Sequence, residues 1–216
     1  IAYLYRLSPV GFLGCCAVGA ANGSYWALGP VFAQQSGLDI AGIAFFMSAT
    51  AIGGALGQWP FGWLSDKMDR RKIIAAICIA ACIAAIAMAL FNGRWPQSIL
   101  YFALLFGLLA LPLYALCVAH MNDFVSADGF VEASSGLLLV YSAGAVCGPL
   151  IAAAFIEWFG KEGLLFFTAT AHAAMAIFAI QRMYQRARPS EEDRSDFVAV
   201  SAATPSAFNL DPRADP

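Results

Sequence analysis

Charged side chains are scarce in this sequence, and they are unevenly spread. Only 12% of the 216 residues are Asp, Glu, Lys or Arg, whereas soluble domains carry about 25%. Six long stretches contain no charge, the shortest of 19 residues and the longest of 32. Because an apolar helix of roughly 20 residues crosses the hydrocarbon core of a bilayer, the sequence excludes an ordinary soluble domain and predicts six transmembrane helices.

The expected membrane domain covers residues 1–185. Its approximate spans are 8–34, 40–65, 73–92, 95–120, 133–157 and 163–184. The alternating polarity that a spanning β-strand needs is missing from these stretches, so we predict an all-α membrane protein. Residues 186–216 are rich in Asp, Glu, Ser, Ala and Pro, and this composition predicts a disordered tail.

The sequence also lacks the common signatures of an enzyme. It contains no H-E-x-x-H motif and no glycine-rich phosphate loop. A serine protease of the membrane would need Ser and His at one depth, but Ser134 and Ser135 lie near a helix edge, away from His172. The six cysteines all fall inside apolar runs, where cysteine behaves as a small hydrophobe. We therefore expect no catalytic site, no metal, no cofactor and no nucleic-acid partner.

The basic residues predict the orientation in the membrane. Of the 12 Lys and Arg residues, ten fall on one side of the expected helices, and only Arg94 and Lys161 fall on the other. Loops rich in Lys and Arg stay in the cytoplasm. We expect a multi-pass protein of the bacterial inner membrane with both ends of this chain cytoplasmic.

The loop between the second and third expected helices is short and densely charged, and residues 62–72 read GWLSDKMDRRK. Taken alone, it predicts a tight hairpin whose Lys and Arg residues set the topology. Asp66 stands at a helix C-terminus, whereas Arg70 and Arg71 begin the next helix, and the helix dipole disfavours each charge at those ends. We expect these charges to pair across the turn or with a neighbouring helix.

This loop resembles the signature loop of the major facilitator superfamily, roughly G-x-L-x-D-[R/K]-x-G-R-[R/K]. The matching residues are Gly62, Leu64, Asp66, Lys67, Arg70 and Arg71. Asp69 replaces the usual glycine. The stretches 112–123, 130–136 and 144–149 are similar to the C-terminal half of the YcaD-like bacterial subfamily, and the resemblance covers about residues 8–185. It implies helices seven to twelve of a twelve-helix secondary transporter that works by alternating access.

The resemblance further implies that the charged loop is a cytoplasmic latch, which stabilises one access state against a helix of the other half. The gating residues would be Gly62, Asp66, Lys67, Arg70 and Arg71. The partners implied are the lipid bilayer, a small-molecule substrate and an N-terminal six-helix half, and a coupling proton or ion is left open. The alternative is a stand-alone six-helix protein that acts as a homodimer or scaffold.

Polar residues inside a membrane are costly and often functional. In the superfamily the first and fourth helices of each half line the central cavity, so the resemblance makes Asn22, Tyr25, Trp26 and Tyr114 candidates for substrate contact. Equally, these side chains could satisfy neighbouring helices or sit at the membrane interface.

Two further groups of residues have a structural and a functional interpretation. Gly144, Gly148 and Pro149 predict a kinked helix at a close helix crossing, and they resemble a glycine-proline motif of antiporters. His120 and Asp123 could form a proton or metal site, but their place at a helix end favours a structural pair.

Overall fold

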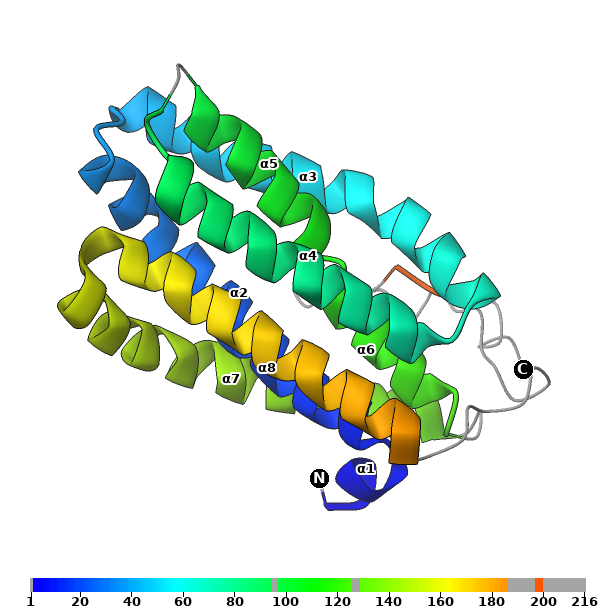
Figure 1. Ribbon diagram of the computed structural model, residues 1–216. Coiled ribbons are helices and arrows are strands. Elements are labelled where there is room, and N and C mark those ends of the chain that lie inside the picture. Colours follow the sequence, from blue (N-terminus) through cyan, green and yellow to red (C-terminus); the bar gives the residue numbers. More distant parts are fainter. Residues whose placement is uncertain (1, 95–96, 126–128, 186–196, 200–216) are drawn as a thin grey trace.

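The computed structural model describes residues 2–94, 97–125, 129–185 and 197–199, and nearly all of them are helical. The helices are α1 (Ala2–Leu7), α2 (Pro9–Gln35), α3 (Ile40–Lys67), α4 (Arg70–Phe91), α5 (Ser98–Ala110), α6 (Leu113–Asn122), α7 (Phe130–Phe159) and α8 (Gly163–Gln185). Figure 1 shows the long helices side by side in one bundle. The all-α fold class expected from the sequence is confirmed. The expected tail lies outside the described residues, except for residues 197–199.

Four stretches of the described chain are long and apolar enough to cross a membrane: Ile40–Lys67, Arg70–Phe91, Ser98–Asn122 and Phe130–Gln185. The last stretch contains both α7 and α8, with a short 3-10 turn between them. α2 has 27 residues and no charge, but its Gly, Ser and Asn residues make it less apolar than these four. With α5 and α6 counted as one span, the described residues form six long helical segments.

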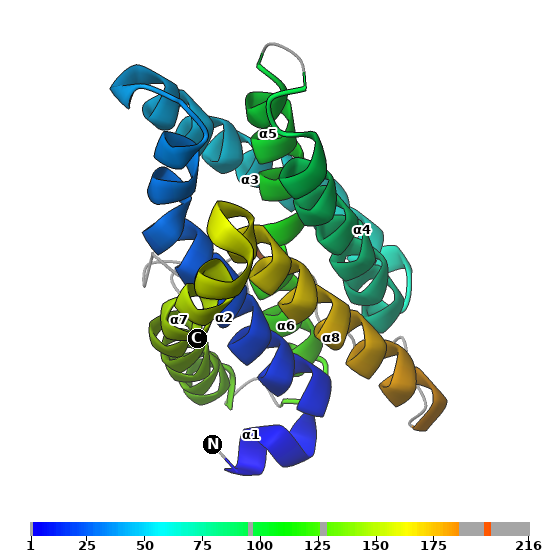
Figure 2. The same cartoon turned by 60° about the vertical axis from the view of Figure 1, so that its left-hand side comes forward.

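The helices form two groups that meet along one seam. α7, α2 and α8 gather on one side of the bundle, and α3, α4 and α5 on the other (Figure 2). α4 packs along α8, and this contact joins the groups. The α3–α4 turn, the last turn of α6, the first turn of α2 and the last turn of α8 meet at one end of the bundle, which we call the charged end. The α2–α3, α4–α5 and α7–α8 connections make up the opposite end (Figure 1).

The helix expected over residues 95–120 is not continuous. α5 ends at Ala110, and α6 begins at Leu113. Pro112 has no N–H to donate to the preceding turn, and its ring crowds that turn, which accounts for the interruption. Every residue of α6 from Leu113 to Met121 is buried, so this short helix lies in the middle of the bundle.

Glycines bring α2 and α7 into backbone contact. A Cβ added to Gly144 would meet the carbonyl oxygen of Cys16, and one added to Gly148 would meet that of Ala20. Small residues four apart permit this approach between membrane helices. The structure therefore places the two glycines at a helix crossing, and α7 continues through Pro149 to Phe159.

A second crossing of the same kind joins α3 and α5. Gly53 and Gly57 of α3 lie against the backbone carbonyls of Leu104 and Leu108. These glycines are not among the residues predicted from the sequence, although they have the same four-residue spacing as the pair in α7. Together the two crossings fix the helices on either side of the seam.

Candidate functional site

The turn between α3 and α4 is closed by Asp69. Its side chain caps α4 by accepting a hydrogen bond from the backbone N–H of Arg71 over 3.0 Å. The φ angle of Asp69 is −63°, which any residue adopts, so this position does not need the glycine that the superfamily pattern usually has. An Asp at the N-cap also places a negative charge where the dipole of α4 favours one.

Arg70 is the centre of the charged end. Its guanidinium donates through Nη2 to Asp66 Oδ1 over 2.7 Å and through Nη1 to Asp123 Oδ1 over 2.9 Å. Nη1 also donates to the carbonyl oxygen of Ala119 over 2.6 Å. Although it is charged, Arg70 is only 2% exposed. One buried cation therefore ties the end of α3 and the end of α6 to the start of α4.

Arg71 makes a separate pair with Asp69. Its Nε and Nη2 donate to the two carboxylate oxygens over 3.1 and 2.9 Å, a forked geometry that carboxylates accept well. Nη1 reaches the carbonyl oxygen of Arg182 on α8 over 3.4 Å. Burial alone would raise the pKa of Asp69. The hydrogen bonds from Arg71, its charge and that of His120 outweigh burial and hold this pKa below its usual value.

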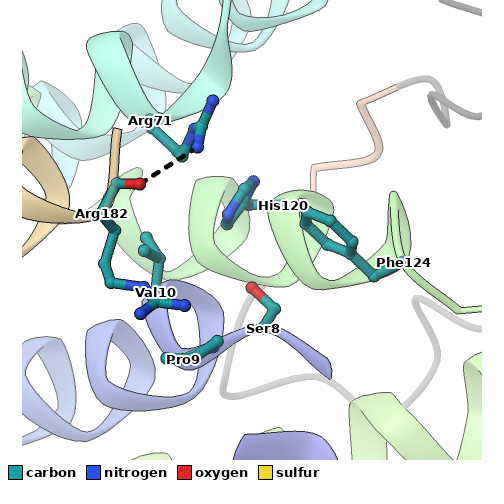
Figure 3. Close-up of a pocket in the computed structure, with 7 residues that line it drawn as sticks. All are labelled: Ser8, Pro9, Val10, Arg71, His120, Phe124 and Arg182. Carbon is teal, nitrogen blue, oxygen red and sulfur yellow. Dashed lines mark hydrogen bonds between the residues drawn. The ribbon is translucent and has the colours of Figure 1, made fainter. Parts of the chain in front are cut away.

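His120 lines a small cavity next to these pairs. The cavity has a volume of about 10 Å³, room for about one water molecule. Its lining residues are Ser8, Pro9, Val10, Arg71, His120, Phe124 and Arg182 (Figure 3). His120 Nδ1 lies 3.9 Å from Asp123 Oδ2, whereas Arg70 Nη1 lies 2.9 Å from Asp123 Oδ1. Within the described residues, no group of three or more metal-binding side chains comes together.

Two of the four candidate substrate residues lie together in the bundle. Tyr114 of α6 meets Tyr141 of α7 edge to face, with ring centroids 4.8 Å apart. The Tyr141 hydroxyl lies beside the Asn22 amide of α2. Asn22 is buried, and its Oδ1 has no hydrogen-bond partner in the described structure. These three side chains therefore form a neutral polar cluster with an unused acceptor.

The other two candidates lie elsewhere. The buried Tyr25 hydroxyl hydrogen-bonds to Thr50 Oγ1 over 2.8 Å, and its ring stacks on Phe106 at 4.8 Å. Tyr25 thus connects α2, α3 and α5 inside the core. Trp26 of α2 is 43% exposed. His172 of α8 is buried as well, with Nδ1 2.6 Å from the carbonyl oxygen of Thr168.

Residues 11–210 match the sequence pattern of the Major Facilitator Superfamily. This chain belongs to that superfamily. Among curated relatives, the MFS-type transporter YcaD of Escherichia coli is 31% identical over 161 residues, which are 74% of this chain and 41% of the relative. YcaD of Salmonella typhi is 27% identical over 184 residues, which are 85% and 47%. The chain thus spans less than half the length of these relatives, both of which carry the word uncharacterized in their names.

A solved structure shows the same fold. A double-tryptophan mutant of XylE superposes on 87% of this chain and 46% of its own length, with a TM-score of 0.59 and 15% sequence identity. Superfamily membership and the apolar helices make this chain a multi-pass membrane protein, not an enzyme. The resemblance seen in the signature loop and in the YcaD-like stretches is confirmed.

Sequence reasoning missed the long-range members of the site. Asp123 was paired with His120, its neighbour on the same helix, but its closer partner is Arg70, 53 residues away. Tyr141 is not among the residues predicted from the sequence, because its contact with Tyr114 depends on how α6 meets α7. The available signal was the position of Arg70 at the start of an apolar run, because an Arg that is buried there needs acceptors from outside its own turn.

Proposed function

We propose that this chain is the C-terminal half of a twelve-helix secondary transporter that moves a small solute by alternating access. The observation that carries the half-transporter proposal is the share of length matched: the chain spans 41–47% of its relatives and superposes on 46% of a solved structure. The YcaD-like stretches favour the C-terminal half. In such transporters the solute binds near the bilayer midplane, between structural repeats. A second six-helix half is therefore the expected partner.

The polar cluster of Asn22, Tyr114 and Tyr141 is the proposed contribution of this half to the solute site. It supplies one amide and two aromatic hydroxyls, and it holds no charge. A buried amide oxygen without a partner is costly, and a solute donor would satisfy Asn22 Oδ1. Asn22→Ala in the full-length transporter should therefore raise the KM for a transported solute, whereas Trp26→Phe should not.

The charged end is the proposed gate. Asp66 and Arg70 belong to the signature loop, and Arg70 pairs with both Asp66 and Asp123, which holds the end of α3, the start of α4 and the end of α6 together. A gate must move as a unit, and the charge-assisted hydrogen bonds of the buried Arg70 make the three helix ends one unit. In this proposal Asp66 also meets a helix end of the other half, which stabilises one access state.

We further propose that the charged end is cytoplasmic, as the ten-to-two distribution of Lys and Arg favours. A cysteine at Met68, in the α3–α4 turn, should react with a membrane-impermeant thiol reagent only from inside the cell. A cysteine at Gln34, at the opposite end, should react from outside. The reverse pattern would contradict the orientation.

Uptake into lipid vesicles tests the transport proposal. Vesicles with the full-length protein are screened against radiolabelled sugars, amino acids, organic cations and neutral aromatic compounds. Vesicles with residues 1–216 alone serve as the comparison. We expect saturable uptake only with the full-length protein. Saturable uptake by residues 1–216 alone would favour the homodimer instead.

A further inference from the structure

A short piece of chain from beyond α8 lies against the charged end of α3. Phe197 donates its backbone N–H to Asp66 Oδ1 over 3.0 Å. Its ring packs on Gly62, one turn earlier on the same helix, and a Cβ added to Gly62 would overlap that ring. Residues 197–199 are the orange segment beside α3 in Figure 1. The glycine at position 62 is thus what allows the ring to rest on the helix backbone.

The contact uses the same oxygen atom as the centre of the charged end. Asp66 Oδ1 accepts from Phe197 and also from Arg70 Nη2, over 2.7 Å. Phe197 is partly buried and packs against the hydrophobic core, whereas Ala199 is exposed. Phe197 therefore covers two residues of the signature loop at once, Gly62 with its ring and Asp66 with its backbone.

We infer that the Phe197 segment is an autoinhibitory strap, which competes with the other half of the transporter for Gly62 and Asp66. The inference rests on the proposed function. A helix N-terminus offers unpaired backbone N–H groups, and Phe197 presents the same group to the same carboxylate. While its ring fills the space on Gly62, no second element can approach Asp66 from that side.

The strength of the contact suits a strap that can be released. It consists of one hydrogen bond and one partly buried ring, whereas the two Arg70 pairs beside it are charged on both partners, and the Arg70–Asp123 pair is buried. A switch requires two states of similar free energy. The docked segment would hold the charged end open, and its release would let the two halves close there.

Hydrogen exchange read by mass spectrometry, on the full-length protein in lipid nanodiscs, tests the strap without any transported solute. Three variants are compared with the wild type: Gly62→Ala, which puts a methyl group where the ring lies; Phe197→Ala, which removes the ring; and Val198→Ala, which shortens the neighbouring side chain as a control. Because hydrogen exchange needs no solute, a failed uptake screen leaves this test of the strap intact, and the two failures can be told apart.

In the wild type we expect the peptide that contains Phe197 to exchange severalfold more slowly than an unstructured chain, and Gly62→Ala should abolish this protection. Phe197→Ala should slow exchange severalfold in the first turns of α7, which begins at Phe130, a few residues after α6 ends at the charged end, because the released charged end closes more of the time. Val198→Ala should leave α7 unchanged. An unprotected Phe197 peptide in the wild type would overturn the inference, and so would unchanged or faster exchange of α7 in Phe197→Ala.

Discussion

The two ends of the bundle are held together in different ways. At the charged end, Arg70 and Asp123 are buried, and the bonds of Arg70 to Asp123, Ala119 and Asp66 join α4 to α6 and α3. At the opposite end, the contacts are polar and more exposed: Asn92 donates to Ser36 over 2.9 Å, and Lys161 lies 3.9 Å from Glu162. Buried charge pairs are costly to break, whereas exposed pairs contribute little. The charged end is therefore the stiff end, as a gate that moves as a unit requires.

The largest expected effect is the loss of the central cation. Arg70→Ala removes the cation that Asp66 and Asp123 share, and breaking a buried pair in this way costs about 3–5 kcal/mol. Arg94→Ala is the matched control, because Arg94 is an exposed cation at the opposite end, 5.5 Å over the Phe91 ring. We expect Arg94→Ala to change the free energy of unfolding by no more than about 0.5 kcal/mol. Thermal unfolding of the purified full-length protein in detergent measures both.

Equal destabilisation by the two Arg substitutions would remove the difference between the ends. It would mean that Arg70 is hydrated in the membrane-embedded protein, despite its burial in this chain.

The second effect concerns the far partner of Arg70. Asp123→Asn keeps the shape but removes the charge that Arg70 Nη1 meets over 2.9 Å, and hydrogen bonds to charged groups are worth about 1.5–3 kcal/mol. Glu162→Gln makes the same change in a more exposed pair at the opposite end, where about 0–1 kcal/mol is expected. Thermal unfolding again supplies the measurement. If Glu162→Gln cost as much as Asp123→Asn, burial would not explain the stiffness of the charged end.

The third effect is on transport more than on stability. The Asp66 side chain is 33% exposed, so Asp66→Asn should cost only about 0–1 kcal/mol of stability. If the charged end is the gate, Asp66→Asn should nevertheless lower the rate of uptake. The two access states differ by only a few kcal/mol, so a small change in their relative free energy changes their populations. Wild-type uptake rates in Asp66→Asn would leave the signature loop with a topological role alone.

A double-mutant cycle sharpens this third prediction. The sequence left open whether Asp66 pairs with Arg70 or Arg71. The structure shows Arg70 on Asp66 and Arg71 on Asp69. The double mutant of Asp66→Asn and Arg70→Ala should therefore lose less free energy of unfolding than the two single mutants lose together. For Asp66→Asn and Arg71→Ala, the loss in the double mutant should equal the sum of the two single losses.

Local patterns were enough to predict much of this fold. Uncharged runs indicated the apolar helices, and the charges of residues 62–72 indicated pairing near the α3–α4 turn. The contacts that sequence could not supply are those between distant segments. Asp123 reaches Arg70 only because α6 packs beside α4, and Phe197 reaches Asp66 across 131 residues. The composition of the tail is polar, and nothing in it predicts that Phe197 contacts Gly62 of α3.

The smallest expected effect is a pH dependence at the charged end. Hydrogen bonds and charge from Arg71 keep the pKa of Asp69 below its usual value despite burial. A carboxylate with a lowered folded-state pKa stabilises the fold above its ordinary pKa, about 3.9 for Asp, and this stabilisation is lost as the pH falls through the lowered value. Wild type should therefore be more stable than Asp69→Asn at pH 7, and the difference should shrink in acid. Thermal unfolding of both proteins between pH 7 and pH 3, roughly the range over which Asp titrates, measures the difference. A difference that stayed constant down to pH 3 would show that Asp69 acts as a neutral cap, and the charged end would then owe its stiffness to Arg70 alone.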